Sequence, residues 1–256
     1  MRHRVAVLTS TAPRHRYFVA AIRKHFEVTV ALHQPKKAKS YMSADVSDEM
    51  RSHFKRLISA EYDEFTPRLG SEELVQLREV VDINDPNLVN EVRETRIDAV
   101  CLFGTAILNS IWLTSFPGRI VNLHLGLSPF YRGTATLFWP FEQGELECVG
   151  TTIHLATEKV DAGAILRRIK ADPKVGEDYY SLSNRLIRRS IDEMPGTVAD
   201  FLSGRIIPQN QDFADSKLFR RRDFTDAALR RMLSQFGEKF SAEQIARAEK
   251  SPKCRC

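Results

Sequence analysis

The apolar and polar positions in the first 35 residues predict a strand, a helix and a second strand. Residues 4–9 form a short apolar run that ends in a Thr-Ser-Thr-Ala-Pro turn, as expected for a buried strand. Phe18, Ile22 and Phe26 follow at helical spacing within residues 15–26. The β-branched run at residues 27–32 favours another strand. This order is typical of a parallel sheet.

The same alternation of strands and helices continues to about residue 205. Apolar runs predict strands at residues 97–103, 119–124, 150–156 and 164–171, and amphipathic stretches predict helices at residues 86–96, 111–116 and 181–202. We therefore expect an α/β fold with one doubly wound, mostly parallel, Rossmann-like sheet that carries helices on both faces. Residues 1–205 would form this domain.

Two segments depart from the pattern. Residues 34–70 are polar and charged, with helical patches between residues 48 and 61, and we interpret them as an excursion over the sheet edge. Residues 206–256 are basic and helical in pattern, with Leu229, Met232, Leu233 and Phe236 as a packing face. We expect them to form a short helical C-terminal extension, because they are too few for a second large domain.

Three polar residues stand where such a sheet would hold a ligand. Asn122 and His124 lie two positions apart at the end of a predicted strand, so their side chains share one face. In open parallel sheets, ligands bind beyond the carboxyl ends of the strands. Asp161 lies in a glycine-containing loop between two later strands, where a carboxylate can reach a cleft.

Each of these residues also has an ordinary structural explanation. A histidine at a strand end is more often hydrogen-bonded than catalytic. An asparagine near a turn commonly caps backbone groups, and an aspartate before Ala-Gly commonly makes a turn. Taken one at a time, the residues leave both explanations open, and it is their order along the chain that favours a functional one.

That order resembles the folate-dependent formyltransferase family. Asn-Leu-His at residues 122–124 is followed by Pro129, by Arg132-Gly133 and later by Val-Asp-Ala-Gly at residues 160–163. The family includes glycinamide ribonucleotide formyltransferase, methionyl-tRNA formyltransferase and the sugar N-formyltransferases. The resemblance covers residues 98–170 well and residues 1–205 loosely.

The turn after the histidine departs from the family pattern. Gly126 stands where the family usually has a serine, and Ser128 stands where it has a second leucine. The departure concerns the turn after the histidine and leaves Asn122, His124 and Asp161 in place.

The resemblance implies an enzyme that moves a formyl group from 10-formyltetrahydrofolate to an amine, without a metal. Asn122 would donate a hydrogen bond to the formyl oxygen, which becomes anionic in the tetrahedral adduct. His124 would either donate to the same oxygen or transfer protons, and proton transfer requires a group that titrates near neutrality. Asp161 would position His124 and favour its charged form, because a nearby carboxylate raises an imidazole pKa.

The resemblance also implies a folate pocket between two loops. The loop after the strand at residues 97–103 and the loop before Asp161 would bind the pterin, largely through backbone groups. The co-substrate-binding residues expected from these loops are Gly104, Thr105, Ile107, Leu108, Glu158 and Val160. Apolar walls with a few polar contacts are typical of small-molecule sites, although Ile107 and Leu108 could equally belong to the core.

The acceptor amine is indicated by features around this site. The first βα turn contains no glycine, unlike the phosphate-binding turn of the nucleotide-substrate relative, although Arg14 and Arg16 could contact an anion. Tyr131, Arg132 and Trp139 lie in an aromatic segment that would suit stacking on a sugar or a base. We expect a nucleotide-linked amino sugar or another small amine as acceptor.

Two other classes of function remain open. A hydrolase that releases formate from formyltetrahydrofolate would use the same three residues, but its relatives carry an N-terminal regulatory domain. A non-catalytic nucleotide- or RNA-binding module would make the three residues incidental. A tRNA substrate is not expected, because the tRNA-formylating relative carries a β-rich C-terminal domain and this extension is short and helical in pattern.

Composition adds little to these expectations. The net charge of +5 and the pI of about 9.1 suit anionic partners, and solubility alone would explain them equally well. The four cysteines suggest no disulfide framework, and we interpret the closing Cys-Arg-Cys as a frayed C-terminal tail that is not held by the rest of the fold. No run approaches the about 20 apolar residues of a membrane helix, and the first apolar run is too short for a signal peptide. We expect a cytoplasmic protein without nucleic-acid or membrane partners.

Overall fold

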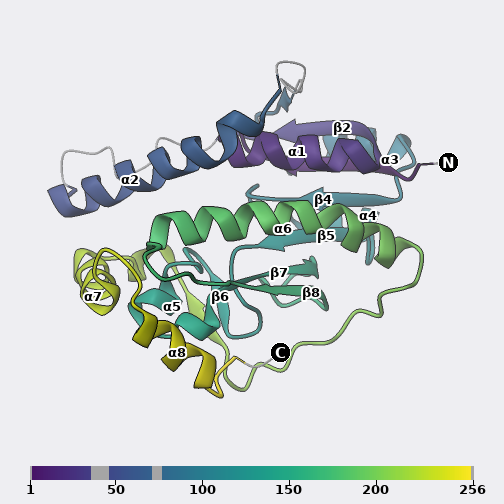
Figure 1. The fold of residues 1–256 in the computed structure, drawn as a ribbon. Helices are drawn as coiled ribbons and strands as arrows, with labels where there is room; N and C mark the ends of the chain where they lie inside the picture. Colours follow the sequence, from purple (N-terminus) through teal and green to yellow (C-terminus); the bar gives the residue numbers. More distant parts are fainter. Residues whose placement is uncertain (1, 36–45, 71–76, 255–256) are drawn as a thin grey trace.

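The computed structural model describes residues 2–35, 46–70 and 77–254 and contains a seven-stranded sheet flanked by helices (Figure 1). The strands of this sheet are, in spatial order, β3 (Arg78–Glu79), β2 (Glu27–His33), β1 (Arg4–Thr9), β4 (Ala99–Leu102), β5 (Ile120–His124), β7 (Gly150–Leu155) and β8 (Ile165–Lys170). The first five run parallel, and β7 and β8 are antiparallel to their neighbours. The expected mostly parallel sheet is confirmed.

Helices lie on both faces of the sheet. They are α1 (Pro13–His25), α2 (Asp48–Phe65), α3 (Pro86–Glu94), α4 (Ser110–Ser115), α5 (Trp139–Glu142), α6 (Tyr179–Leu202), α7 (Asp226–Phe236) and α8 (Ala242–Lys250), with 3-10 turns η2 (Thr66–Arg68), η4 (Leu146–Cys148) and η5 (Arg221–Asp223). The helices predicted at residues 15–26, 86–96 and 181–202 are therefore present, with ends that differ by two residues at most.

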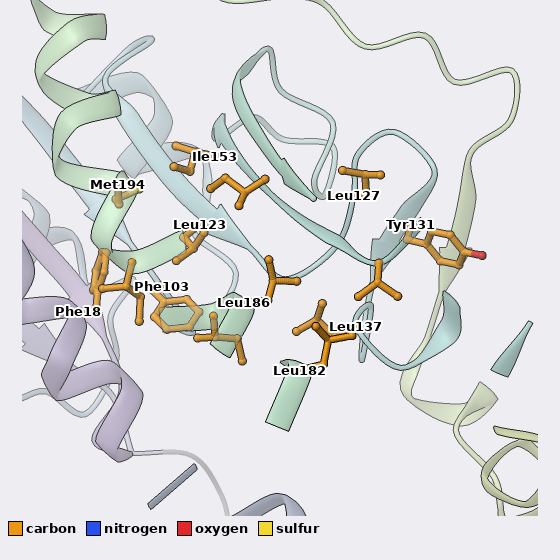
Figure 2. Close-up of a cluster of buried hydrophobic side chains, with 14 of the residues drawn as sticks. Phe18, Phe103, Leu123, Leu127, Tyr131, Leu137, Ile153, Leu182, Leu186 and Met194 are labelled. Carbon is orange, nitrogen blue, oxygen red and sulfur yellow. The ribbon is translucent and has the colours of Figure 1, made fainter. Parts of the chain in front are cut away.

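The sheet is buried on both faces, which explains the apolar runs in its strands. Val5 and Val7 of β1 belong to a core cluster with residues of α1 and α6 (Figure 2). Ala6 and Leu8 of the same strand pack with residues of α3 and α4 on the opposite face. Successive side chains of a strand point to opposite faces, so a strand covered on both sides needs no polar positions.

The excursion expected at residues 34–70 contains the long helix α2. Ser47 caps its N-terminus by accepting a hydrogen bond from the amide of Met50. Met50 and Phe65 are buried in the main core cluster, and the helix contacts α1 and α6. Residues 36–45 of the excursion lie outside the described residues.

The C-terminal extension packs on the sheet domain and is not entirely helical. Its strand β9 (Lys217–Phe219) pairs in parallel with β6 (Tyr131–Gly133), and Gln209 forms an isolated bridge with Ile165. Leu229, Met232 and Phe236 of α7 are buried, as their spacing predicted, and Leu233 is half-buried against the same core cluster. No helix of the described residues is both long enough and apolar enough to cross a bilayer.

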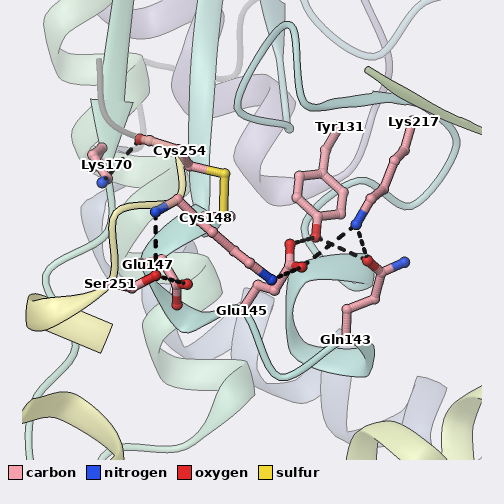
Figure 3. Close-up of a disulfide and its surroundings, with 10 residues drawn as sticks. Tyr131, Gln143, Glu145, Glu147, Cys148, Lys170, Lys217, Ser251 and Cys254 are labelled. Carbon is pink, nitrogen blue, oxygen red and sulfur yellow. Dashed lines mark hydrogen bonds and ion pairs between the residues drawn. A yellow bond between two sulfur atoms is a disulfide. The ribbon is translucent and has the colours of Figure 1, made fainter. Parts of the chain in front are cut away.

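A disulfide joins Cys148 to Cys254 and corrects the expectation of a frayed tail (Figure 3). The carbonyl oxygen of Cys254 also accepts a hydrogen bond from Lys170 at 3.2 Å, and Lys253 forms an ion pair with Glu145. The bonded cysteines are 106 residues apart in the sequence, so their spacing carried no signal of the pairing. Cys101 is a buried free thiol.

Candidate functional site

A cavity of about 1340 Å³ lies beyond the carboxyl ends of β1, β4 and β5. Residues that follow these strands line it, including Arg14, Gly104 and Leu125. This edge of a parallel sheet is where ligands bind in open α/β folds. Pockets that hold one drug-sized ligand measure about 300–1,000 Å³, and this cavity exceeds that range, so it is large enough for more than one small molecule.

Asn122 and His124 lie at the end of β5 and both line this cavity. The side chain of His124 is buried, with Nε2 3.0 Å from the carbonyl oxygen of Tyr131. Its Nδ1 lies 3.4 Å from Oδ1 of Asp161. Both ring nitrogens therefore face oxygen atoms, and because a carbonyl oxygen only accepts, Nε2 is the donor to Tyr131.

Asp161 reaches the site from the loop between β7 and β8. Its φ is 51°, a left-handed conformation that aspartate tolerates better than most residues. The backbone amide of Gly133 donates to Oδ2 at 2.9 Å, which fixes the carboxylate beside His124. A Cβ at Gly163 would lie 1.7 Å from the carbonyl oxygen of Leu155, so the loop requires glycine there.

A residue from the C-terminal extension holds the same loop. Nε2 of Gln211 donates to the carbonyl oxygens of Asp161, at 3.0 Å, and Gly163, at 2.6 Å. Nη1 of Arg132 also donates to the carbonyl oxygen of Val160, at 3.4 Å. The position of the carboxylate therefore depends on side chains far from it in the sequence.

His154 completes the site, although it was not predicted from the sequence. It lies on β7 directly opposite Asn122, and its Nε2 is 3.1 Å from Nδ2 of that residue. Nδ1 of His154 is 2.8 Å from the carbonyl oxygen of Leu155, so Nδ1 donates and Nε2 accepts from Asn122. Nε2 also lies 3.7 Å from Oδ1 of Asp161. The signal in the sequence was a histidine within an otherwise apolar strand.

Burial sets the charge state of His124 more strongly than Asp161 does. Loss of hydration lowers the pKa of His124 below its usual value, although Asp161 acts to raise it. Asp161 therefore favours the charged form of His124, as expected, but burial outweighs this effect and the pKa of His124 is lowered overall. Burial also acts to raise the pKa of Asp161, but its interactions with the His154 and His124 side chains and the hydrogen bond from the amide of Gly133 lower it overall. The site therefore combines a neutral imidazole with a carboxylate near pH 7.

Gly126, the departure in the turn after His124, has a steric reason. A Cβ at this position would lie 2.4 Å from Nε2 of His124, 2.6 Å from the carbonyl oxygen of Tyr131 and 2.7 Å from Cβ of Thr136. The hydrogen bond from His124 to Tyr131 passes over the space that a side chain would need. A serine therefore does not fit here in this arrangement.

All the residues expected in the two folate loops line the cavity, namely Gly104, Thr105, Ile107, Leu108, Glu158 and Val160. The Ile107 side chain is 73% exposed, which places it at the cavity and not in the core. The loop around Ile107 is anchored by Asn84, whose Nδ2 donates to the carbonyl oxygen of Ile107 at 3.0 Å. These positions suit a wall for a flat ligand.

The expected acceptor-binding arginines differ in position. Arg14 lines the cavity, and its Nη1 lies 2.6 Å from Oε2 of Glu61 on α2. Arg16 does not belong to the described cavity lining, and its Nε donates to the carbonyl oxygen of Thr11 at 3.2 Å. Of these two arginines, Arg14 is therefore the one placed to contact a ligand in this cavity.

The aromatic segment after His124 packs inward, which corrects its expected role in stacking. Tyr131 and Trp139 are 1% and 3% exposed, and both rings stack on Phe219 of β9. Arg132 is also buried, with Nε 2.7 Å from Oγ of Ser216. None of these three residues belongs to the described lining of the cavity, because the extension covers them.

Residues outside the predicted loops line the remainder of the cavity. They come from α2, from the first half of α6 and from the extension, and include Met50, His53, Phe54, Asn184, Arg221 and Phe224. Sequence patterns gave no sign that these segments meet. Within the described residues, no group of three or more metal-ligating side chains converges.

Comparison with known families identifies the sheet domain. Residues 3–197 match the family model described as formyl transferase. The methionyl-tRNA formyltransferase of Trichlorobacter lovleyi is 31% identical over 136 residues, which are 52% of this chain and 42% of that protein. The chain spans less than half the length of the first curated relatives that it matches.

Solved structures share the fold over most of the chain. A sugar N-formyltransferase from Shewanella sp FDAARGOS_354 matches with a TM-score of 0.60 and 16% identity, covering 92% of this chain and 89% of that one. The formyltransferase PseJ from Anoxybacillus kamchatkensis, solved with a UDP-linked formamido sugar and tetrahydrofolate, matches with a TM-score of 0.51 and 16% identity. It covers 91% of this chain and 98% of that one.

Proposed function

Because the chain belongs to the formyl transferase family, we propose that it transfers the formyl group of 10-formyltetrahydrofolate to the primary amine of a nucleotide-linked amino sugar. The observation that carries this proposal is the meeting of Asn122, His124 and Asp161 in one cavity with room for two ligands. Two substrates must meet at a shared centre in a group transfer, and this cavity offers polar groups at such a centre.

The reaction needs stabilisation of an oxyanion and transfer of a proton. The amine nitrogen bonds to the formyl carbon, the bond from that carbon to the folate nitrogen breaks, and a proton passes from the amine to the leaving nitrogen. One amide hydrogen of Asn122 bonds to His154, and the second would donate to the formyl oxygen. One such donor is worth about 10²–10³ in rate.

His124 would carry the proton. Its lowered pKa leaves the ring neutral near pH 7, so Nδ1 can accept a proton from the attacking amine. The imidazolium formed in this way lies 3.4 Å from Asp161, which stabilises the charge until the proton passes to the leaving nitrogen. The folate would lie against the loop at residues 104–108 and the loop at residues 157–160, where apolar and backbone groups line the cavity.

An amino-sugar acceptor is supported by the extent of the shared fold. The sugar N-formyltransferase from Shewanella and PseJ each match more than nine-tenths of this chain, so the shared fold includes part of the C-terminal extension. That extension supplies part of the cavity wall. Other small amines remain the alternative acceptors, and we do not propose a nucleic-acid substrate.

The proposal is tested by incubating the protein with 10-formyltetrahydrofolate and a panel of nucleotide-linked amino sugars and simple amines. A mass gain of one formyl group on an acceptor supports it. His124→Ala should abolish most turnover while the dissociation constant for folate changes little, because the role of His124 grows in the transition state. Formate release at the same rate without any amine would contradict it and indicate a hydrolase.

A further inference from the structure

The cavity has a second part that the proposed chemistry does not use. We call this part the outer lobe and define it by His53 and Phe54 of α2, Asn184 of α6, and Arg221 and Phe224 of the C-terminal extension. These residues lie outside the two loops expected to bind folate. A ligand that reaches the outer lobe would therefore be the acceptor, and the lobe would contact the portion of it that does not react.

Aromatic rings form one wall of the outer lobe. The ring of Phe224 lies 4.5 Å from Phe138, 5.8 Å from Phe54 and 6.0 Å from His53, measured between centroids. Phe54 and Phe224 are half-buried and line the cavity. Burial lowers the pKa of His53 to about 4, so this wall is uncharged near pH 7. An uncharged aromatic wall suits a planar ring.

The wall is held in place by contacts between α2 and the extension. Asp226 at the start of α7 accepts a hydrogen bond from Ser47, which caps α2. Nη1 of Arg230, in α7, lies 3.0 Å from Oε2 of Glu49, in the first turn of α2. Figure 1 shows the two helices at the same end of the molecule. The two phenylalanines are therefore positioned before a ligand arrives, which lowers the entropic cost of binding.

A cationic side chain stands beside the aromatic wall. Arg221 in η5 lines the cavity three residues before Phe224. A guanidinium group binds phosphate through paired hydrogen bonds, and base stacking on aromatic side chains is the usual way in which proteins contact a nucleobase face. A planar ring next to an anion is the chemistry of a nucleotide.

We propose that the outer lobe binds the nucleotide part of the acceptor, with the base against Phe224 and Phe54 and a phosphate at Arg221. This inference rests on the proposed function and assigns the recognition of the acceptor to the C-terminal extension. Tyr131 and Trp139, the aromatic residues expected from the sequence to stack on the acceptor, take no part in it.

Binding of UDP, thymidine diphosphate and GDP to the folate-free protein, measured by calorimetry, tests the inference. At least one diphosphate should bind, and Phe224→Leu should weaken it about tenfold or more, since a stacked base contributes about 1–3 kcal/mol. Phe224→Tyr keeps a ring and should retain most of the affinity. Arg221→Ala should weaken the diphosphate and inorganic pyrophosphate but not the free nucleoside. Arg222→Ala, an exposed neighbour outside the cavity lining, should change none of these.

The outcomes separate this inference from the proposed function. If the wild-type protein binds none of the three diphosphates, or if Phe224→Leu and Arg221→Ala bind them as tightly as the wild type, the inference is wrong even when formyl transfer occurs. Equal formylation of an amino sugar with and without its nucleotide also overturns it. If a diphosphate binds as described but no amine is formylated, the proposed function is wrong.

Discussion

Asn122 and His154 face each other across the antiparallel pair β5 and β7, with Nδ2 of the amide 3.1 Å from Nε2 of the imidazole. Because His154 accepts one amide hydrogen, the Asn122 side chain has a fixed orientation. The direction of its second amide hydrogen is then fixed as well, because the amide group is planar. Leu155 in turn fixes the tautomer of His154 by accepting from Nδ1. The orientation of the proposed oxyanion donor is therefore set by the sheet itself.

His154 should accordingly act as a positioning residue. His154→Ala should lower kcat by about tenfold or more, since it loosens a donor that is itself worth about 10²–10³. His154→Gln offers an acceptor to Asn122 and should recover part of the rate. Steady-state kinetics and folate titration check this, and a loss confined to KM would show that His154 serves binding instead.

The pH dependence should reflect the lowered pKa of His124. The plot of kcat/KM against pH should have an acid limb whose apparent pKa lies below the usual histidine value of about 6.5, because burial disfavours the charged ring. Asp161→Asn removes the group that raises this pKa, so the limb should move to lower pH while kcat falls. Both effects are measured by recording kcat and kcat/KM over a range of about pH 4.5 to 8.5, which spans this limb. An upward shift in the Asp161→Asn variant would contradict the assignment.

Gly126→Ser should damage the site by steric conflict. The added Cβ would meet His124, Tyr131 and Thr136 at distances well below ordinary contact, so His124 must move. We expect a large fall in kcat and a loss of about 1–3 kcal/mol in the free energy of unfolding. Gly196→Ala is the matched control, because Gly196 is exposed on α6 and a Cβ there meets nothing within 4 Å. That change should stabilise the helix by about 0.5–1 kcal/mol. An active, stable Gly126→Ser variant would show that the turn readily rearranges.

The disulfide should contribute measurably to stability. Cys254→Ser removes a cross-link between residues 106 apart, and loss of a native cross-link costs about 2–5 kcal/mol. Cys148→Ser should have the same effect, and the double variant should be no worse than either. Urea unfolding measures this, with the reduced wild type as reference. If the reduced and oxidised proteins unfold at the same urea concentration, the cross-link contributes nothing.

The fold and the three central polar residues could be predicted for a physical reason. A sheet that is buried on both faces leaves continuous apolar runs, and a polar residue at the end of such a run is conspicuous. Asn122 and His124 stood out in this way, and Asp161 stood out through its glycine-containing loop. His154 did not, because a histidine inside a strand resembles a residue that is merely packed.

The features that sequence patterns missed all depend on distant partners. Tyr131 and Trp139 are buried because Phe219 of the extension stacks on them, and no periodicity in a turn-rich segment shows which side a ring will face. The pairing of Cys148 with Cys254 is equally remote. The net direction of the His124 pKa shift could not be predicted from the nearby carboxylate alone, because burial opposes Asp161 and depends on the packing of the whole site.

The hydrogen bonds from Gln211 have a consequence for the order of events during synthesis of the chain. A nascent polypeptide that ends near residue 205 already contains Asn122, His124, His154 and Asp161, yet it lacks the amide that holds the carbonyl oxygens of Asp161 and Gly163. The amide of Gly133 would still donate to the carboxylate, but the backbone of the loop that carries Asp161 would lack its hydrogen bonds to Gln211. Full catalytic activity should therefore arise only once residue 211 has emerged from the ribosome and the segment around it has folded back onto the sheet.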